Sequence, residues 1–434
     1  MKMYSSYGNK RAIEAWQSLV HVCRRLRNLV FASPYHLNLR LYCTNKTPVR
    51  DTLDVWPALP LIVEGYTDLL SSTDNVIAAL RQSNRVCQVY LWIYAGWQLE
   101  EVLAAMLVPF PQLADLRLLS SGETLPVIPD SFLGGSASGL QFLQFRGIPF
   151  PGLPKLLSSA THLVRLHLSD IPHSGYISPE AIVALLSVLS SLKTLSLGFE
   201  SSQSRPDRET RRPLPSKRSV IPALDHFRFE GVIDYLEVLV TLIDAPQLEG
   251  MQIAFFDQIG FDTPRLAQFI NRTPKLRKRD AHVQFDHKFA CIALPPGYHT
   301  LEIAISCTEL HRQLSSIVQV CNSSLKPLFT VEDLYIKHKY LRVYAIENTL
   351  WLQLLLPFTA VKNLYLSKDF APGIAAALQE VVEGRGVLPN LQNIFVEGFL
   401  PSGPFQKSIG GFVAARQLSD HPITISVWDR PKNL

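Results

Sequence analysis

The hexapeptide LVRLHL at residues 163–168 shows the pattern that decides the fold. An apolar residue is followed, after two residues of any kind, by a second apolar residue, and after one more residue by a third. The same spacing recurs in LKTLSL at residues 192–197 and in nine further places. Successive starts lie 23 to 33 residues apart, except for one gap of 50 between Leu248 and Tyr298. Such a fixed period indicates a stack of similar structural units.

The repeated unit resembles the leucine-rich repeat, and the resemblance covers most of residues 86–398. It implies an α/β solenoid, a right-handed horseshoe with parallel strands on one side and helices on the other. The family places Asn or Cys three residues after the third apolar position, and none of the eleven units does so, so the repeats are degenerate. The eleven units begin at Val86, Leu113, Leu140, Leu163, Leu192, Leu224, Leu248, Tyr298, Val331, Val361 and Leu391.

The connections between the apolar triplets predict helices at several places. Apolar residues at helical spacing favour helices over 99–107, 179–189, 233–243, 264–271, 309–320, 346–356 and 374–383. Ser178 and Thr263 each precede a proline at the start of such a segment. Both are therefore expected to cap a helix with their hydroxyl groups.

Four regions follow from this pattern. Residues 1–35 hold a short N-terminal helical segment, 36–85 a linker and capping segment, 86–398 about 11 to 12 repeats, and 399–434 a C-terminal cap. The gap of 50 predicts an irregular twelfth unit, because Ala281, Val283 and Phe285 alternate as in a strand. Residues 200–220 are polar and rich in Pro and Arg, and we interpret them as a mobile loop.

Composition limits the possible functions. Residues 205–218 and 272–279 together carry a charge of +9 and the rest of the chain −4, which gives the net charge of +5. The basic charge is therefore local, and the sequence does not favour nucleic-acid binding. These basic runs are typical of solvated loops. The six cysteines form no CxxC pair. We find no secretory signal and no apolar run long enough to span a bilayer. We therefore expect a cytoplasmic or nuclear protein without membrane association.

No catalytic pattern is visible, and we expect neither an enzyme nor a cofactor. The sequence contains no GxSxG, GxxxxGK[ST] or HExxH motif. Six histidines and cysteines between residues 282 and 311 do not have the spacing of a zinc site. We therefore interpret them as structural residues and expect no metal site.

The residues between the buried positions of each strand point to the open side of the sheet. At the fifth position of three successive units stand Tyr335, Tyr365 and Phe395. They are expected to form a row with neighbours about 5 Å apart. Arg117, Arg146 and Arg165 are expected to form a basic patch toward the other end. Aromatic residues and Arg are enriched at binding hot spots, so both groups are candidate target-binding residues. Packing of the rings on each other or on the C-terminal tail is an equal alternative.

The first helix resembles the last helix of an F-box. It contains Val-Cys-Arg-Arg-Leu-Arg at residues 22–27, where the family often has Val-Cys-Arg-x-Trp-Arg. The resemblance is to fungal F-box proteins with degenerate leucine-rich repeats. It implies adaptor-binding residues at Trp16, Leu19, Val20, Val22, Cys23 and Leu26. The ten residues before Arg11 contain no Leu-Pro-x-Glu-type segment, so we expect weak binding or none. A plain amphipathic cap on the first repeat is the alternative.

Taken with this resemblance, the pattern predicts a non-catalytic protein-recognition subunit. The implied partners are the Skp adaptor of a cullin ubiquitin ligase and an unknown protein target. The alternative is a freestanding leucine-rich-repeat scaffold for protein interactions that has no role in ubiquitination.

Overall fold

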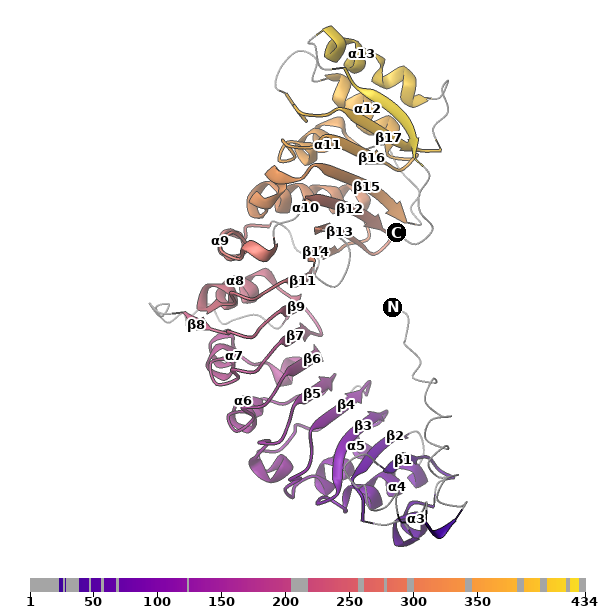
Figure 1. The fold of residues 1–434 in the computed structure, drawn as a ribbon, viewed down its shortest axis with the longest axis vertical. Coiled ribbons are helices and arrows are strands. Elements are labelled where there is room, and N and C mark those ends of the chain that lie inside the picture. The colour runs from indigo at the N-terminus through magenta and orange to yellow at the C-terminus, as the bar shows by residue number, and fades with distance from the viewer. Residues whose placement is uncertain are drawn as a thin grey trace. The chain divides into compact units, whose positions relative to one another are not determined.

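The computed structural model is a mixed α/β protein in which parallel strands alternate with helices (Figure 1). None of the described helices is both long and apolar enough to cross a membrane. The structure describes residues 23–25, 28, 39–46, 48–55, 58–67, 70–122, 125–203, 218–256, 261–276, 279–294, 300–339, 346–380, 386–398, 404–418 and 422–428.

The chain forms two compact units. Unit 1 comprises residues 1–177 and 184–192, and unit 2 comprises residues 178–183 and 193–434. Residues of the helix α7 (Pro179–Leu186) fall in both.

In unit 1 the strands follow chain order from β1 to β6, and all their pairings are parallel. Helices or short 3-10 turns connect them. The elements are β1 (Leu39–Cys43), α3 (Val49–Val55), β2 (Leu61–Thr67), α4 (Leu70–Leu80), β3 (Val86–Ile93), α5 (Gly96–Ala105), β4 (Asp115–Ser120), η3 (Phe132–Gly135), β5 (Phe142–Arg146), α6 (Leu153–Leu157), β6 (Arg165–Ile171) and η4 (His173–Gly175).

In unit 2 the strand order is β7-β9-β11-β14-β13-β12-β15-β16-β17-β18. A separate small pairing joins β8 and β10. The elements are β7 (Thr194–Phe199), β8 (Ser219–Val220), β9 (His226–Gly231), α8 (Ile233–Leu242), β10 (Ile243–Asp244), β11 (Gly250–Phe255), α9 (Pro264–Asn271), η5 (Pro274–Leu276), β12 (Asp280–Asp286), β13 (Phe289–Leu294), β14 (Leu301–Ser306), α10 (Leu310–Ser324), η6 (Lys326–Thr330), β15 (Asp333–Lys339), α11 (Asn348–Leu355), β16 (Asn363–Leu366), α12 (Ala371–Glu380), β17 (Asn393–Glu397), α13 (Pro404–Leu418) and β18 (Thr424–Trp428).

The apolar triplets form the core, as their spacing predicts. Leu166, Leu195, Leu334 and Leu364 all lie on strands and are fully buried. Their neighbours in the sequence face the other side, because successive side chains of a strand alternate. Every one of the eleven units has its strand. The predicted leucine-rich-repeat fold class is confirmed in its parallel strands and its helices.

The parallel array extends beyond the residues that the spacing marks. Residues 36–85, expected as a linker and cap, contain β1 and β2, and β2 pairs in parallel with β3. Residues 399–434, expected as a C-terminal cap, contain β18, which pairs in parallel with β17. The alternation of residues 37–41 predicts a strand, and β1 overlaps it. The strands β2 and β18 were not predicted, because their apolar residues do not follow the 3-then-2 spacing.

The gap of 50 residues holds a hairpin rather than one irregular repeat. The predicted strand around Val283 exists as β12, but β12 pairs in parallel with β15 and not with β11. The hairpin partner β13 was not predicted. It is antiparallel to both β12 and β14, so the sheet of unit 2 is mixed.

Two predicted helix caps have different outcomes. The Ser178 hydroxyl accepts the Ala181 N–H at 3.2 Å, so that cap is confirmed. The Thr263 side chain makes no capping hydrogen bond at α9, so that prediction is wrong. The carboxylate of Glu237, on α8, accepts the backbone N–H groups of Arg265 and Leu266 at 3.0 and 2.8 Å instead. A side chain from the neighbouring repeat thus satisfies donors at this helix start.

The basic runs are only partly described. Of the predicted loop 200–220, Ser219 and Val220 form β8, and residues 204–217 lie outside the described part of the chain. Arg272 does not belong to a solvated loop. Its guanidinium donates to the Asp244 carboxylate at 2.7 Å and to the carbonyl oxygens of Val240 and Ile243 at 2.7 and 2.8 Å. It therefore holds α9 to the end of α8.

Candidate functional site

The predicted aromatic row exists on the open face of unit 2, the side of the strands away from the helices. Strand pairing places Tyr335 of β15 opposite Tyr365 of β16, and Tyr365 opposite Phe395 of β17. The ring centroids are 4.2 and 4.6 Å apart, and the ring planes differ by 9° and 10°. A fourth ring extends the row, because His282 of β12 stacks on Tyr335 at 4.4 Å and 13°. We call His282, Tyr335, Tyr365 and Phe395 the aromatic row.

The alternative interpretation of these rings also holds, since they pack on each other and on the C-terminal strand. Trp428 of β18 lies 6.0 Å from Tyr335 and 5.6 Å from Tyr365, tilted against both rings. The ammonium group of Lys337 lies over Tyr335 at 4.9 Å and over Trp428 at 5.4 Å. Lys337 is only 3% exposed, so this cation is held between rings. Trp428 therefore covers the row on the side toward Lys337.

The two tyrosine hydroxyl groups are coupled. Burial raises the pKa of Tyr335, and the charge of Tyr365 and a hydrogen bond to its side chain raise it further. Burial also raises the pKa of Tyr365, and the hydrogen bond to Tyr335 opposes this rise only in part. The charges of Asp333 and Asp280 raise both pKa values further.

Burial lowers the pKa of His282 from 6.5 to about 4, and the nearby Lys337 adds to this effect. His282 Nδ1 lies 3.3 Å from Lys337 Nζ. Between those pH values the unfolded chain binds more protons than the folded chain. The contribution of His282 to stability is therefore largest above about pH 6.5 and falls as the pH approaches 4.

We expect His282→Phe, which keeps a ring in the row, to remove the loss of stability that His282 causes between pH 6.5 and pH 4. The difference between 6.5 and about 4 corresponds to at most ~3 kcal/mol, and solvent screening at this partly exposed ring reduces it to ~1–2 kcal/mol. The measurement is the free energy of unfolding of both proteins by denaturant between pH 7 and pH 4. Parallel pH curves for the two proteins would contradict the assignment.

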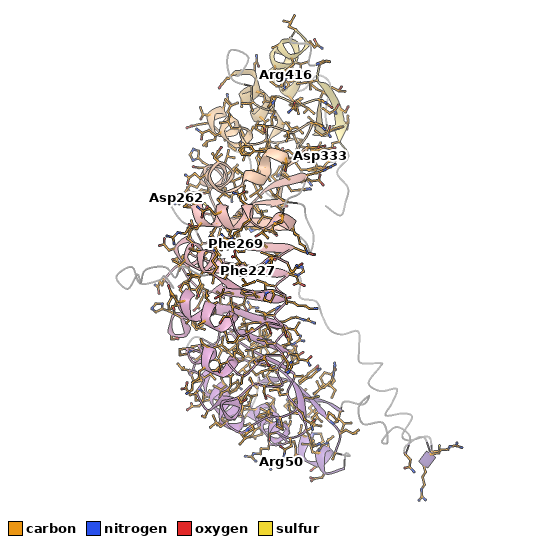
Figure 2. All side chains as sticks on the ribbon, turned by 60° about the vertical axis from the view of Figure 1, so that its left-hand side comes forward. Arg50, Phe227, Asp262, Phe269, Asp333 and Arg416 are labelled. Carbon is orange, nitrogen blue, oxygen red and sulfur yellow. The ribbon has the colours of Figure 1, made fainter. Side chains whose placement is uncertain are left out.

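A polar ladder borders the aromatic row two residues earlier on the same strands. The side-chain amide of Asn393 donates to the amide oxygen of Asn363 at 2.8 Å. The Asn363 amide in turn donates to the Asp333 carboxylate at 2.7 Å. Asp333, labelled in Figure 2, lies opposite Asp280 of β12. The ladder therefore ends at two neighbouring carboxylates.

The predicted basic patch of unit 1 is largely compensated by carboxylates. Arg117 makes two bonds to Asp115, at 2.8 and 2.7 Å, and its guanidinium lies 4.3 Å from the Phe142 ring. Arg146 pairs with Asp170 at 2.6 Å. Arg165 also lies over Phe142, at 5.6 Å. The three arginines lie on successive strands, but their net positive charge is smaller than the sequence indicates.

Unit 1 has a second aromatic surface that sequence reasoning missed. Tyr66 of β2 lies opposite Trp92 of β3, and the Trp92 and Tyr94 rings are 6.4 Å apart. Tyr66, Tyr94 and Trp97 are about half exposed. The period-2 alternation of residues 61–67 could have indicated Tyr66, but the region lies outside the repeat spacing.

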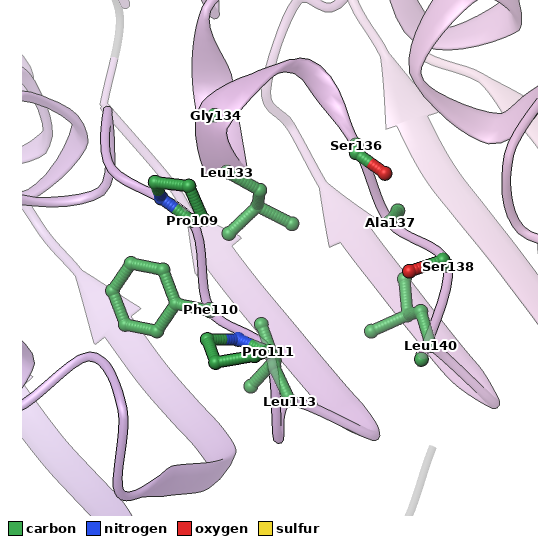
Figure 3. A pocket seen from close by; sticks show the side chains of 11 residues that line it. Pro109, Phe110, Pro111, Leu113, Leu133, Gly134, Ser136, Ala137, Ser138 and Leu140 are labelled. Atoms are coloured by element: carbon green, nitrogen blue, oxygen red, sulfur yellow. The ribbon is translucent and has the colours of Figure 1, made fainter.

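A small hollow in unit 1 is lined by apolar side chains, two serines and backbone groups (Figure 3). Its volume is about 180 Å³, and its lining includes Phe110, Leu113, Leu133 and Leu140. Leu133 has a left-handed backbone, with φ of 54°. The next residue must be glycine, because a Cβ at Gly134 would lie 2.7 Å from a Pro109 carbon. Among its side chains only those of Ser136 and Ser138 carry a hydrogen-bonding group, and none is charged, so the hollow is not our candidate site.

Of the six predicted adaptor-binding residues, the structure describes Cys23, which is exposed. The other five, Trp16, Leu19, Val20, Val22 and Leu26, lie outside the described residues. Among the described residues no group of three or more His, Cys, Asp or Glu side chains could hold a metal ion.

The fold and its uncovered strand face define an α/β repeat protein of the leucine-rich type. No family model matches the chain, and no curated protein does. It is similar in structure to the leucine-rich repeat-containing protein LegL7 from Legionella pneumophila, with 14% identity and a TM-score of 0.30, over 87% of this chain and 97% of that one. It is also similar to TLR13 in a complex with ssRNA13, with 12% identity and a TM-score of 0.33, over 89% of this chain. It spans about half (52%) of the TLR13 chain.

Proposed function

We propose that this protein is a non-catalytic recognition subunit that binds another protein through the open face of unit 2. The observation that carries the proposal is the aromatic row, four stacked rings on the side of the strands that the helices leave uncovered. Each of its rings is half-buried. Large rings held in one geometry lose little entropy on binding and supply much contact area.

Because the rings stack on one another, substituting one of them affects the stability of the protein as well as its binding. Alanine at Tyr365 removes ring contacts to Tyr335, Phe395 and Trp428. Such contacts contribute about 0.5–1.5 kcal/mol beyond the buried area, so stability falls as well as binding. Binding must therefore be measured well below the melting temperature of the variant.

We expect Tyr365→Ala to weaken binding of the partner protein about tenfold or more, a loss of ~1–2 kcal/mol. The partner is first identified by proximity labelling, and its dissociation constant is then measured with purified proteins. Phe329→Ala is the matched control, because Phe329 is an exposed ring in η6, outside the open face. Equal affinities for the wild type and Tyr365→Ala would contradict the proposal.

The finer proposal is that this subunit serves a cullin-type ubiquitin ligase. The resemblance of residues 11–31 to an F-box helix supports it, and the implied partner is the Skp adaptor. The test is adaptor binding by the 434-residue chain and by a form extended with any upstream residues that encode a Leu-Pro-x-Glu segment. Binding by the extended form supports the adaptor role. If neither form binds, the freestanding interaction scaffold is the better description.

A further inference from the structure

The sheet face next to the aromatic row brings two carboxylates together. Asp280 of β12 and Asp333 of β15 lie directly opposite each other on parallel strands. Both face the open side, because Ala281 and Leu334, which follow them, are fully buried. Neighbouring strands are about 4.8 Å apart, so like charges at facing positions repel.

Nothing in the described part of the chain neutralises this pair by direct contact. No ion pair of the described residues includes either carboxylate, and Asp280 makes no side-chain hydrogen bond there. Asp333 accepts one bond, from Asn363. Burial raises the pKa of Asp280, Asp333 raises it further, and Arg279 only partly opposes them. The repulsion between the two carboxylates is thus retained in the folded protein, and an incoming cation would relieve it.

The aromatic row lies about 6.6 Å further along the same strands, since a strand rises about 3.3 Å per residue. This distance matches the length of an arginine side chain, whose apolar stem can lie on rings while its head binds carboxylates. Trp428 covers the row on the side toward Lys337, which is the side away from Asp280 and Asp333. The carboxylate side is therefore the accessible one.

We propose that the open face of unit 2 docks an arginine-bearing segment of a partner protein, whose guanidinium is received by Asp280 and Asp333 and whose stem lies along the aromatic row. The proposal rests on the recognition function proposed above and names the chemistry of the partner. Arginine fits better than lysine, because its planar fork can donate to two carboxylates at once.

The test uses four immobilised libraries of 12-residue peptides, whose central residue is fixed as Arg, Lys, Gln or Glu. We expect the full chain to retain the arginine library at least fivefold more than the glutamine library, and the lysine library to an intermediate degree. The double variant Asp280→Asn, Asp333→Asn keeps the acceptor for Asn363. It should lose this preference while its melting temperature rises, because the repulsion is removed.

Glu397→Gln is the matched control, since it removes another carboxylate of the open face, on β17. It should leave the preference unchanged. Equal or greater retention of the glutamine or glutamate library by the wild type would overturn the proposal. So would an arginine preference that survives in the double variant. If Tyr365→Ala reduces retention of all four libraries equally, the recognition surface stands and only the arginine inference fails.

Discussion

Leu195→Asp is expected to lower the free energy of unfolding by at least ~3 kcal/mol, enough to unfold much of unit 2. Leu195 is the second apolar residue of its triplet, lies on β7 and is fully buried. It faces Phe227 of β9, which is also buried. A carboxylate at this position would be desolvated in an apolar layer without a partner. Denaturant unfolding followed by circular dichroism measures the loss.

The next residue along the strand supplies the control. Ser196 is partly exposed, and its side chain points to the open face. Ser196→Asp should change the free energy of unfolding by less than ~1 kcal/mol. If both substitutions cost the same, the alternation that underlies the repeat would be refuted.

Arg272→Met is expected to lower the free energy of unfolding by about 2–3 kcal/mol. The guanidinium satisfies the Asp244 carboxylate and two carbonyl oxygens at the end of α8, and its side chain is only 24% exposed. Methionine keeps much of the apolar stem but leaves these acceptors without their donor. Thermal and denaturant unfolding of the purified variant would show the effect.

Lys275→Met is the matched control for the same basic run. Lys275 bonds Gln247 and Glu249 at the surface, and its side chain is 41% exposed. Exposed pairs contribute about 0–1 kcal/mol, so this variant should stay near the wild type. If Arg272→Met loses less free energy of unfolding than Lys275→Met, Arg272 is a solvated loop residue after all and the account is contradicted.

The spacing of apolar residues predicts most of the fold, because each apolar triplet can be buried in only one arrangement of the strands. Leu334 and Leu364 can be buried together only if their strands lie side by side with the same face inward. The hairpin β12–β13 could not be predicted, since its pairing depends on which strands meet across α9 and α10. Alternation around Val283 indicates a strand but does not say which neighbour it takes.

The candidate site could be predicted in part. Regular strands fix the outward direction of Tyr335, Tyr365 and Phe395, so their row follows from counting. His282 and Trp428 were missed, because the first depends on the hairpin and the second on a strand outside the repeat spacing. The ion pairs that neutralise Arg117 and Arg146 were not predicted, for a different reason. Salt bridges between neighbouring outward residues depend on side-chain geometry, which the spacing of the apolar residues does not specify.

The central claim, recognition of a protein by the open face of unit 2, is tested most directly by site-specific photo-crosslinking. The photoreactive residue p-benzoylphenylalanine replaces Phe395 in the aromatic row, or Leu356, which is 48% exposed at the end of α11 on the helix side. With the purified partner protein, position 395 should give a crosslink that excess unlabelled protein abolishes, and position 356 should give none. Crosslinking from position 356 but not from position 395 would contradict the account.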